Sequence, residues 1–503
     1  RDYGATWEDI TPADMPPGGT VNVLDLSAHD PGRAHIAVYR YRENDFRPYV
    51  FQTNDYGSSW ELLTDGSNGI PETNFVRAIR EDPERQGLLF AGTEFGVFFS
   101  IDGGSNWVAL AGGAPTIAFR DLAIQQREND LVGATFGRGF WILDDYSPLR
   151  EVSEKSLQQE AALFAVRPAP WYLPKLPLGD FEEGGKASQG DAFFVAPNPP
   201  FGAVLTYYLR DGLKTGRDAR IEQEKETAEG GGDTPYPGWD ALRAEEVEED
   251  PAIVLTVTDS AGEVVRQLEG PVEAGFHRLA WDLRYPLSSP WTPEPAGDSY
   301  IHIPGPLASP GSYRVSLAKR VNGELTRLGE PRAFEVVSIV EQAMQGASPE
   351  QAVAFTRRLD DINRQVNGAE SAITALLTET GAIKDTLLRS SAPAALRDEA
   401  RRLELELLAL QDKLKGNTRR DLYQDIGTLS VKARLQAAVM GTFRSTYGPT
   451  PTHLANVEIA ESEFATVKQA IERIIQTELP ALRTQLDENG VPWTPGRGVP
   501  AGS

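Results

Sequence analysis

The spacing of hydrophobic positions divides the chain into two parts. Up to about residue 340, apolar residues come in short runs separated by turn sequences such as Asp30-Pro31-Gly32, a pattern typical of β-strands. From Ser348 onward, apolar residues follow one another at steps of three and four, which is typical of one face of a helix. The pattern therefore predicts an all-β part followed by an all-α part.

One short motif recurs in the first 150 residues. Its pattern is Asp-x-Gly-x-x-Trp, and its copies begin 53 and 47 residues apart. A period of this size is that of a propeller blade, a four-stranded sheet that recurs around an axis. The motif residues are Asp2, Gly4 and Trp7 in the first copy, Asp55, Gly57 and Trp60 in the second, and Asp102, Gly104 and Trp107 in the third.

The residue types of this motif predict a structural role. In a tight turn, an Asp side chain accepts hydrogen bonds from the following amides, Gly takes a positive φ, and Trp packs between strands. Apolar runs between the motifs flank turns at residues 30–32, 82–83 and 128–130, so we expect three blades. No Gly and Trp follow Asp145 at motif spacing, which places the end of the propeller near Pro148.

These motifs carry a family resemblance. They resemble the Asp-box, or bacterial neuraminidase, repeats of β-propeller proteins, and the run ATFGRGFWILDD at residues 134–145 is similar to large bacterial sortilin-like proteins labelled glycosyl hydrolases. The resemblance implies that residues 1–148 are the C-terminal blades of a larger protein located outside the cytoplasm. Sorting receptors carry a cysteine-rich module after the propeller, and this chain departs from them because it has no cysteine.

The middle of the chain predicts a linker and a second β-domain. Residues 149–200 are rich in Pro and Gly and are expected to form a linker. Residues 201–340 alternate short apolar runs with turns, as in a β-sandwich of the immunoglobulin (Ig) or fibronectin type. The expected strands are residues 203–209, 252–258, 264–268, 276–283, 312–318 and 332–337.

An acidic insertion interrupts this second domain. Residues 221–250 contain eleven acidic side chains and two basic ones, so mutual repulsion predicts an extended, solvated loop. The alternative is a calcium site formed by Asp233, Asp240 and Glu245, although their spacing is not that of a calcium-binding loop. Apart from this calcium alternative, the sequence predicts no cofactor.

Residues 346–488 predict a four-helix, up-and-down bundle. The first apolar seam runs from Ala352 to Leu376, the second from Leu396 to Leu414, and the third helix is expected around residues 422–443. The fourth seam includes Ile475, and its helix is expected to kink at Pro480. These seams could instead form a dimeric coiled coil. Residues 489–503 are expected to be a flexible tail.

Composition narrows the range of partners. With 73 acidic and 49 basic residues, the net charge of −24 repels nucleic acids and anionic membranes. No apolar run approaches the roughly 20 residues of a membrane helix. The chain begins at Arg1 without a Met or a signal peptide, so we expect it to be cut from a longer protein whose upstream blades are its partners.

Catalytic motifs are not found in the sequence. The five histidines lack zinc-ligand spacing, and there is no Gly-x-Ser-x-Gly elbow or phosphate-binding glycine loop. Glycoside hydrolysis needs two carboxylates across a cleft, and the sequence singles out no such pair. Because sialidases hold a substrate carboxylate with arginines, Arg138 is the one candidate for ligand binding.

Three functions agree with these observations. The expected one is a non-catalytic binding or scaffold role, with a protein or a glycan as ligand. The second is a glycoside hydrolase, sialidase-like or xyloglucanase-like, whose active site lies mostly upstream of Arg1. The third is an assembly factor that binds a protein partner.

Overall fold

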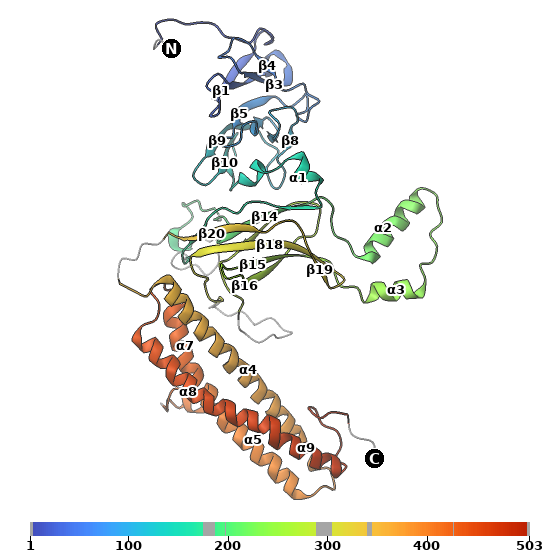
Figure 1. The fold of residues 1–503 in the computed structure, drawn as a ribbon, viewed down its shortest axis with the longest axis vertical. Coiled ribbons are helices and arrows are strands. Elements are labelled where there is room, and N and C mark those ends of the chain that lie inside the picture. Colours follow the sequence, from blue (N-terminus) through green and yellow to red (C-terminus); the bar gives the residue numbers. More distant parts are fainter. Residues whose placement is uncertain are drawn as a thin grey trace.

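The computed structural model describes residues 4–174, 187–196, 198–287, 304–339, 345–425 and 427–499. Three parts follow one another along its long axis (Figure 1). A stack of β-sheets occupies the N-terminal end, two further sheets pack against each other in the middle, and helices form the C-terminal end. The predicted order of β-structure before helical structure is confirmed.

The stack contains one antiparallel sheet for each expected repeat, with its strands in chain order. The first sheet consists of β1 (Thr20–Leu26), β2 (Ala34–Arg40), β3 (Asp45–Thr53) and β4 (Glu61–Leu62). The second consists of β5 (Val76–Glu81), β6 (Leu89–Thr93), β7 (Gly96–Ser100) and β8 (Val108–Ala109). Within the described residues, the third has only β9 (Phe119–Gln125), β10 (Asp130–Thr135) and β11 (Phe140–Leu143).

Hydrophobic side chains hold the sheets of the stack together. Val50 of the first sheet and Ile79 of the second belong to one buried cluster, and Phe90 of the second and Leu122 of the third belong to another. Met15, from the segment before β1, packs on the far face of the first sheet. Each sheet therefore buries apolar residues on a neighbour, which a single four-stranded sheet could not do alone.

Two sheets packed face to face form the middle part. One sheet has the order β12 (Ala161–Leu163), β14 (Ala203–Leu209), β17 (Gly275–Trp281). The other has the order β13 (Ala169–Trp171), β20 (Arg332–Ser338), β18 (Gly311–Val321), β15 (Ala252–Thr258), β16 (Val264–Gly270), and β19 (Glu324–Arg327) pairs with β18. Trp281 and Tyr207 are fully buried between these sheets. All six predicted strands form, within a few residues of their expected bounds.

Two short strands lie where the sequence predicted only a linker. β12 pairs with β14, and β13 pairs in parallel with β20, so both belong to the packed sheets. Each is only three residues long, and such a segment has too few positions to show an alternating pattern. These strands form because their backbone groups find partners on sheets made by distant residues.

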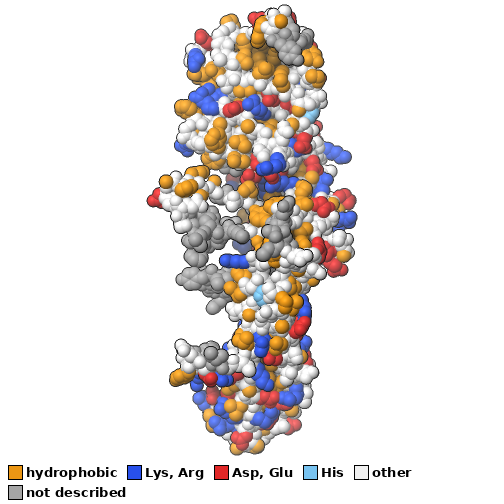
Figure 2. Space-filling view, turned by 90° about the vertical axis from the view of Figure 1, so that its left-hand side faces the viewer, with side chains coloured by type: hydrophobic (Ala, Val, Ile, Leu, Met, Phe, Trp, Pro, Cys, Tyr) orange, Lys and Arg blue, Asp and Glu red, His pale blue; other side chains and the backbone are white. Residues whose placement is uncertain are grey.

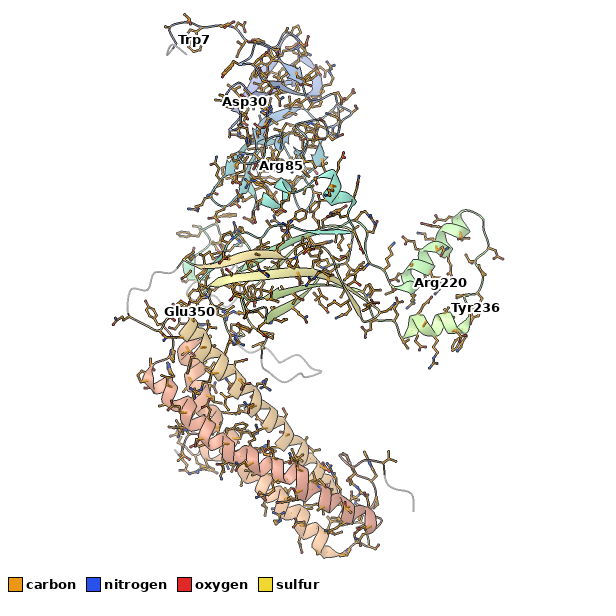
Figure 3. All side chains as sticks on the ribbon, in the orientation of Figure 1. Trp7, Asp30, Arg85, Arg220, Tyr236 and Glu350 are labelled. Carbon is orange, nitrogen blue, oxygen red and sulfur yellow. The ribbon has the colours of Figure 1, made fainter. Side chains whose placement is uncertain are left out.

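The acidic insertion is helical, which corrects the prediction of an extended loop. Helices α2 (Gly216–Glu229) and α3 (Trp239–Glu246) form an arm that projects from the packed sheets (Figure 3). The Thr215 hydroxyl caps α2, and Arg220 pairs with Glu224 and Glu245. These local hydrogen bonds and ion pairs offset the repulsion between the acidic groups. Within the described chain, neither helix buries a side chain.

Long helices share one core at the C-terminal end. They are α4 (Pro349–Leu387), α5 (Ala394–Lys415), α7 (Val431–Thr442), α8 (Pro451–Arg473) and α9 (Leu479–Glu488), with the short α6 (Thr418–Leu422) between α5 and α7. The apolar seams of these long helices join in a single buried cluster, so they pack against one another within one chain. Of the helices in the described residues, none has the length and apolar character needed to cross a bilayer. The remaining short helix, α1 (Glu154–Gln158), lies before β12.

Two details of the helical part differ from the prediction. Residues 474–478 form a π-helical turn, and Ile474, not Ile475, is buried in the core. The wide turn accommodates Pro480, which has no N–H for the usual helical hydrogen bond. After α9, the chain folds back so that Val491, Thr494 and Arg497 are buried.

Candidate functional site

The second copy of the repeated motif is a tight turn between β3 and β4. The Asp55 carboxylate accepts hydrogen bonds from the Ser59 amide at 2.8 Å and from the Ser59 hydroxyl at 2.7 Å. The Thr53 hydroxyl accepts from the Gly57 amide at 2.9 Å, and Gly57 has a φ of 87°. Hydrogen bonds from Ser59 lower the pKa of Asp55. This carboxylate therefore stabilises the turn as an ionised acceptor.

The third copy has the same geometry between β7 and β8. Asp102 accepts hydrogen bonds from the Asn106 amide and side chain at 2.9 and 2.8 Å, and Gly104 has a φ of 94°. Burial raises the pKa of Asp102, but hydrogen bonds from Asn106 and Ser100 outweigh it and lower the pKa overall. A general acid needs a raised pKa, so both turns have the chemistry of a scaffold.

Each turn packs on the segment that follows the preceding motif. A Cβ atom on Gly57 would lie 2.6 Å from the Ile10 side chain, and one on Gly104 would lie 2.9 Å from Leu63. Ile10 and Leu63 both lie eight residues after a motif Asp in the sequence. Glycine is therefore required here for close approach as well as for its φ.

The three motif tryptophans have different surroundings. Trp107 is buried with the residues between the first and second sheets, and Trp60 is half-buried and donates to the Ile10 carbonyl at 2.7 Å. Trp7 lies in an extended N-terminal segment and is 91% exposed (Figure 3). Gly4 has a φ of 85°, as in the other copies, and Asp2 lies outside the described residues. Trp107 thus packs on the sheet before its own, whereas Trp60 packs on its own sheet and on the segment before β1.

Arg138 lies at the tip of the hairpin between β10 and β11. It is exposed, between Gly137 and Gly139, which both have positive φ values. Among the described residues, it has no hydrogen-bond or ion-pair partner and no second arginine beside it in the turn. Arg138 is therefore an exposed turn residue, and its role in ligand binding stays a prediction.

An apolar face of the third sheet lies next to this turn. Leu131 and Leu143 lie on the side of the third sheet that contacts the second sheet. Side chains alternate between the two faces of a sheet, so Val132, Phe140 and Ile142 lie on the opposite side, which we call the outer face. Phe140 is 76% exposed and Ile142 is 57% exposed. Hydrophobic side chains also gather on the surface of the stacked sheets in Figure 2. The sequence showed this strand as an apolar run but not which side chains remain uncovered.

Charged side chains connect the first strands of the three sheets. Arg80 of β5 donates to Asp121 of β9 at 2.9 Å and lies 3.9 Å from Asp25 of β1. Asp25 also accepts from the Glu81 amide at 2.8 Å. Burial raises the pKa of Asp25, while the Glu81 amide and Arg80 lower it by less. In the sequence, the one indication of this charged cluster is a polar residue inside an otherwise apolar strand, such as Asp25 in TVNVLDL.

This charged cluster links sheet to sheet, and the Asp121 side chain at its edge is 59% exposed. Glu81 is buried, and so is the neighbouring His35 of β2, whose Nε2 lies 3.0 Å from the Gln52 side-chain oxygen. No described group of three or more His, Cys, Asp or Glu side chains could hold a metal ion. Of the three residues of the calcium alternative, Glu245 is held by Arg220 at 2.7 and 2.8 Å.

Comparisons with known proteins give only distant likenesses. No protein-family model and no curated protein matches the chain. The chain is similar to a GH74 enzyme from Niastella koreensis, with 16% identity over 25% of this chain and 21% of that one, and a TM-score of 0.22. It is also similar to YCF48 bound to a D1 peptide, with 20% identity over 29% and 47% of the chains and a TM-score of 0.21.

A third likeness covers more of the chain. The GH74 xyloglucanase from Xanthomonas campestris is 11% identical over 67% of this chain and 40% of that one, with a TM-score of 0.19. These findings show structural similarity, at low TM-score, to Asp-box β-propeller proteins. The chain spans less than half the length of these three proteins. At such scores the likeness carries no argument about function, which must come from the geometry above.

Proposed function

We propose that the chain is a binding and scaffold part of a larger Asp-box propeller protein outside the cytoplasm. In this proposal, the three stacked sheets are blades, the packed sheets are an Ig-like domain, and the helices are a rigid bundle. Further blades continue the stack on the outer face of the third sheet. A protein or a glycan is the ligand of the complete propeller.

The exposure of the outer face supports this proposal. Phe140 and Ile142 occupy the places in β11 that Val97 and Phe99 occupy in β7 of the second sheet, one and three residues after a glycine. Val97 is only 4% exposed because the third sheet covers it, whereas Phe140 is 76% exposed. Exposed apolar residues in a continuous row mark an interaction surface. A further sheet of the same kind would bury them as Val97 is buried.

The absence of cysteine from the chain allows a direct test. The variant Phe140→Cys carries a single thiol, whose rate of alkylation by a maleimide is measured in this chain and in the longer gene product that contains it. We expect alkylation to be roughly tenfold slower in the longer protein, because a neighbouring blade covers residue 140.

The variant Leu325→Cys is the control for this experiment. Leu325 is exposed on β19, at the edge of the middle part and away from the stack, so its alkylation rate should be equal in both proteins. Equal rates for Phe140→Cys as well would overturn the proposal that further blades continue the stack.

A further inference from the structure

A cavity of about 280 Å³ lies where the packed sheets meet the helices. Trp171, Arg284 and Leu307 line it from the side of the sheets, and α4 and α7 line it from the other side. Its volume lies just below the range of about 300 to 1,000 Å³ that is usual for drug-sized ligands. The cavity therefore suits a smaller molecule.

Both polar and apolar side chains of α4 and α7 line this cavity. On α4, Asp360, Asn363 and Asn367 recur at steps of three and four, beside the buried seam that contains Leu359 and Ile362. On α7, Gln436 and Val439 likewise lie beside the buried seam. Because of the helical period, a row of polar side chains on α4 faces a row on α7 that contains both polar and apolar side chains.

Three side-chain amides in the cavity lack partners. Within the described part of the chain, Asn363, Asn367 and Gln436 make no hydrogen bond, although Asn363 and Asn367 are half-buried. Their polar atoms are therefore free to pair with a molecule in the cavity. Each amide offers both donors and an acceptor, which is the complement of a hydroxyl group.

The charges around the cavity balance one another. Lys432 donates to Glu370 at 2.5 Å, and the lining also contains one further positive charge, Arg284, and one further negative charge, Asp360. Arg284 donates to the Gly305 carbonyl at 2.8 Å, and burial lowers the pKa of its guanidinium. A charged ligand would need an uncompensated opposite charge, so this lining favours a neutral one.

We propose that this cavity binds a neutral, hydroxyl-rich molecule of monosaccharide size. Its hydroxyls pair with Asn363, Asn367 and Gln436, and its C–H face packs on Val439 and Phe443, which also line the cavity. The site is separate from the stacked sheets, so it does not depend on the role proposed for them.

The test uses the whole chain and defined sugars. D-glucose, D-xylose and N-acetyl-D-glucosamine are each titrated, and binding is measured by saturation-transfer NMR on the sugar. With only a few hydrogen bonds and a small apolar contact, at least one sugar should bind with a dissociation constant of about 1 mM. No transfer to any of the three sugars would overturn the proposal.

Two variants locate the binding. Asn363→Leu with Asn367→Leu removes both α4 amides, and Gln436→Ala removes an exposed one on α7 that makes no hydrogen bond within the described residues. Each should weaken binding by about tenfold or more. The control Gln469→Leu replaces an exposed amide of α8 outside the cavity and should bind as the wild type does. Undiminished binding by Gln436→Ala and the double variant, with melting temperatures unchanged, would overturn the assignment.

The same assay distinguishes two sources of the ligand. Methyl glycosides and β-linked disaccharides of the sugar that binds are compared with the free sugar. Binding of both assigns the cavity to the end of a glycan, and binding of the free sugar alone assigns it to a free metabolite. Both results retain the hydroxyl-rich chemistry of the proposal.

Discussion

At the scale of single residues, carboxylates in the stacked sheets serve as structural acceptors. Buried Asp82, in the turn between β5 and β6, accepts hydrogen bonds from Tyr146 at 2.6 Å and from Arg150 at 2.8 Å. Burial raises the pKa of Asp82, but these hydrogen bonds outweigh it and lower the pKa overall. The motif residues Asp55 and Asp102 behave in the same way, so these three carboxylates each hold a turn in place.

His35 is the buried residue with the clearest consequence for pH. It is fully buried, and its Nδ1 atom lacks a hydrogen-bond partner among the described residues. Burial lowers the pKa of His35, and the charge of Arg33 lowers it further. The opposing effects of Glu81, Gln52 and Asp25 raise this pKa by less. The folded stack therefore keeps His35 neutral at a pH where the unfolded chain would protonate it.

This lowered pKa predicts a loss of stability in mild acid. The contribution of His35 is complete above its unfolded pKa of about 6.5 and is lost as the pH falls below it, by up to about 1.4 kcal/mol per pH unit. Urea denaturation of the wild type and of His35→Gln between pH 8 and pH 5 measures the free energy of unfolding. The variant should show a flatter dependence, whatever its absolute stability.

The control for this experiment is His453→Gln, which changes a partly exposed histidine of α8. It should keep the wild-type dependence on pH, because His35 is still present. Asp25 has a raised pKa and contributes in the opposite sense at lower pH, so the comparison is made above pH 5. A wild-type slope in His35→Gln would contradict the prediction.

At the scale of elements, the last helices keep the regular spacing of buried apolar residues until Pro480, which cannot make the usual helical hydrogen bond, changes it. In the fourth seam, the buried positions run through Val467 and Ile471 to Ile474, and then resume at Leu479. The step of five residues across the π-helical turn moves Ile475 to the surface, where it is 43% exposed. A regular helix would have kept the step of four that the sequence predicted.

Two matched substitutions test this register. Ile474→Ala removes a fully buried side chain and should lower the free energy of unfolding by about 2 to 5 kcal/mol. Ile475→Ala removes an exposed one and should cost less than about 1 kcal/mol. Both are measured by urea denaturation followed by the helical circular dichroism signal. The reverse order of the two costs would show that the helix keeps its regular register.

At the scale of the whole molecule, hydrogen bonds join the stack to the packed sheets. Arg278 of β17 donates to the backbone carbonyls of Asp144 and Asp145, which follow the last strand of the stack. Arg167 donates to the Glu128 carbonyl at 3.1 Å, across the same junction. Because these acceptors are backbone atoms, the junction is fixed by the fold of both parts and not by one flexible side chain.

The junction predicts a measurable change in shape. Arg278→Met keeps most of the apolar stem but removes both hydrogen bonds, each worth about 1 kcal/mol. We expect small-angle X-ray scattering to show a larger and more variable distance between the stack and the packed sheets. The control Arg314→Met, at an exposed position on β18, should leave the profile unchanged. Identical profiles for both variants would show that other contacts fix the junction.

Much of this organisation follows from local sequence. The turns at Asp55 and Asp102 need only an Asp, a Gly and the amides of neighbouring residues, all within one short segment. Strands such as β14 and β15 form at their predicted bounds because their apolar runs suit a buried sheet. Ser348 caps α4 as the sequence predicted, since capping is also a local interaction.

Other features depend on partners far away in the chain. β12 and β13 exist only because distant strands accept them, and the unpaired amides of Asn363 and Gln436 meet only because α4 and α7 pack together. The exposure of Phe140 likewise depends on whether another sheet lies against it. By itself, the sequence determined the repeats, the strands and the helical seams, since these arise from neighbouring residues. Only the tertiary structure decided which side chains face a cavity, a neighbour or solvent, because burial depends on how distant elements pack.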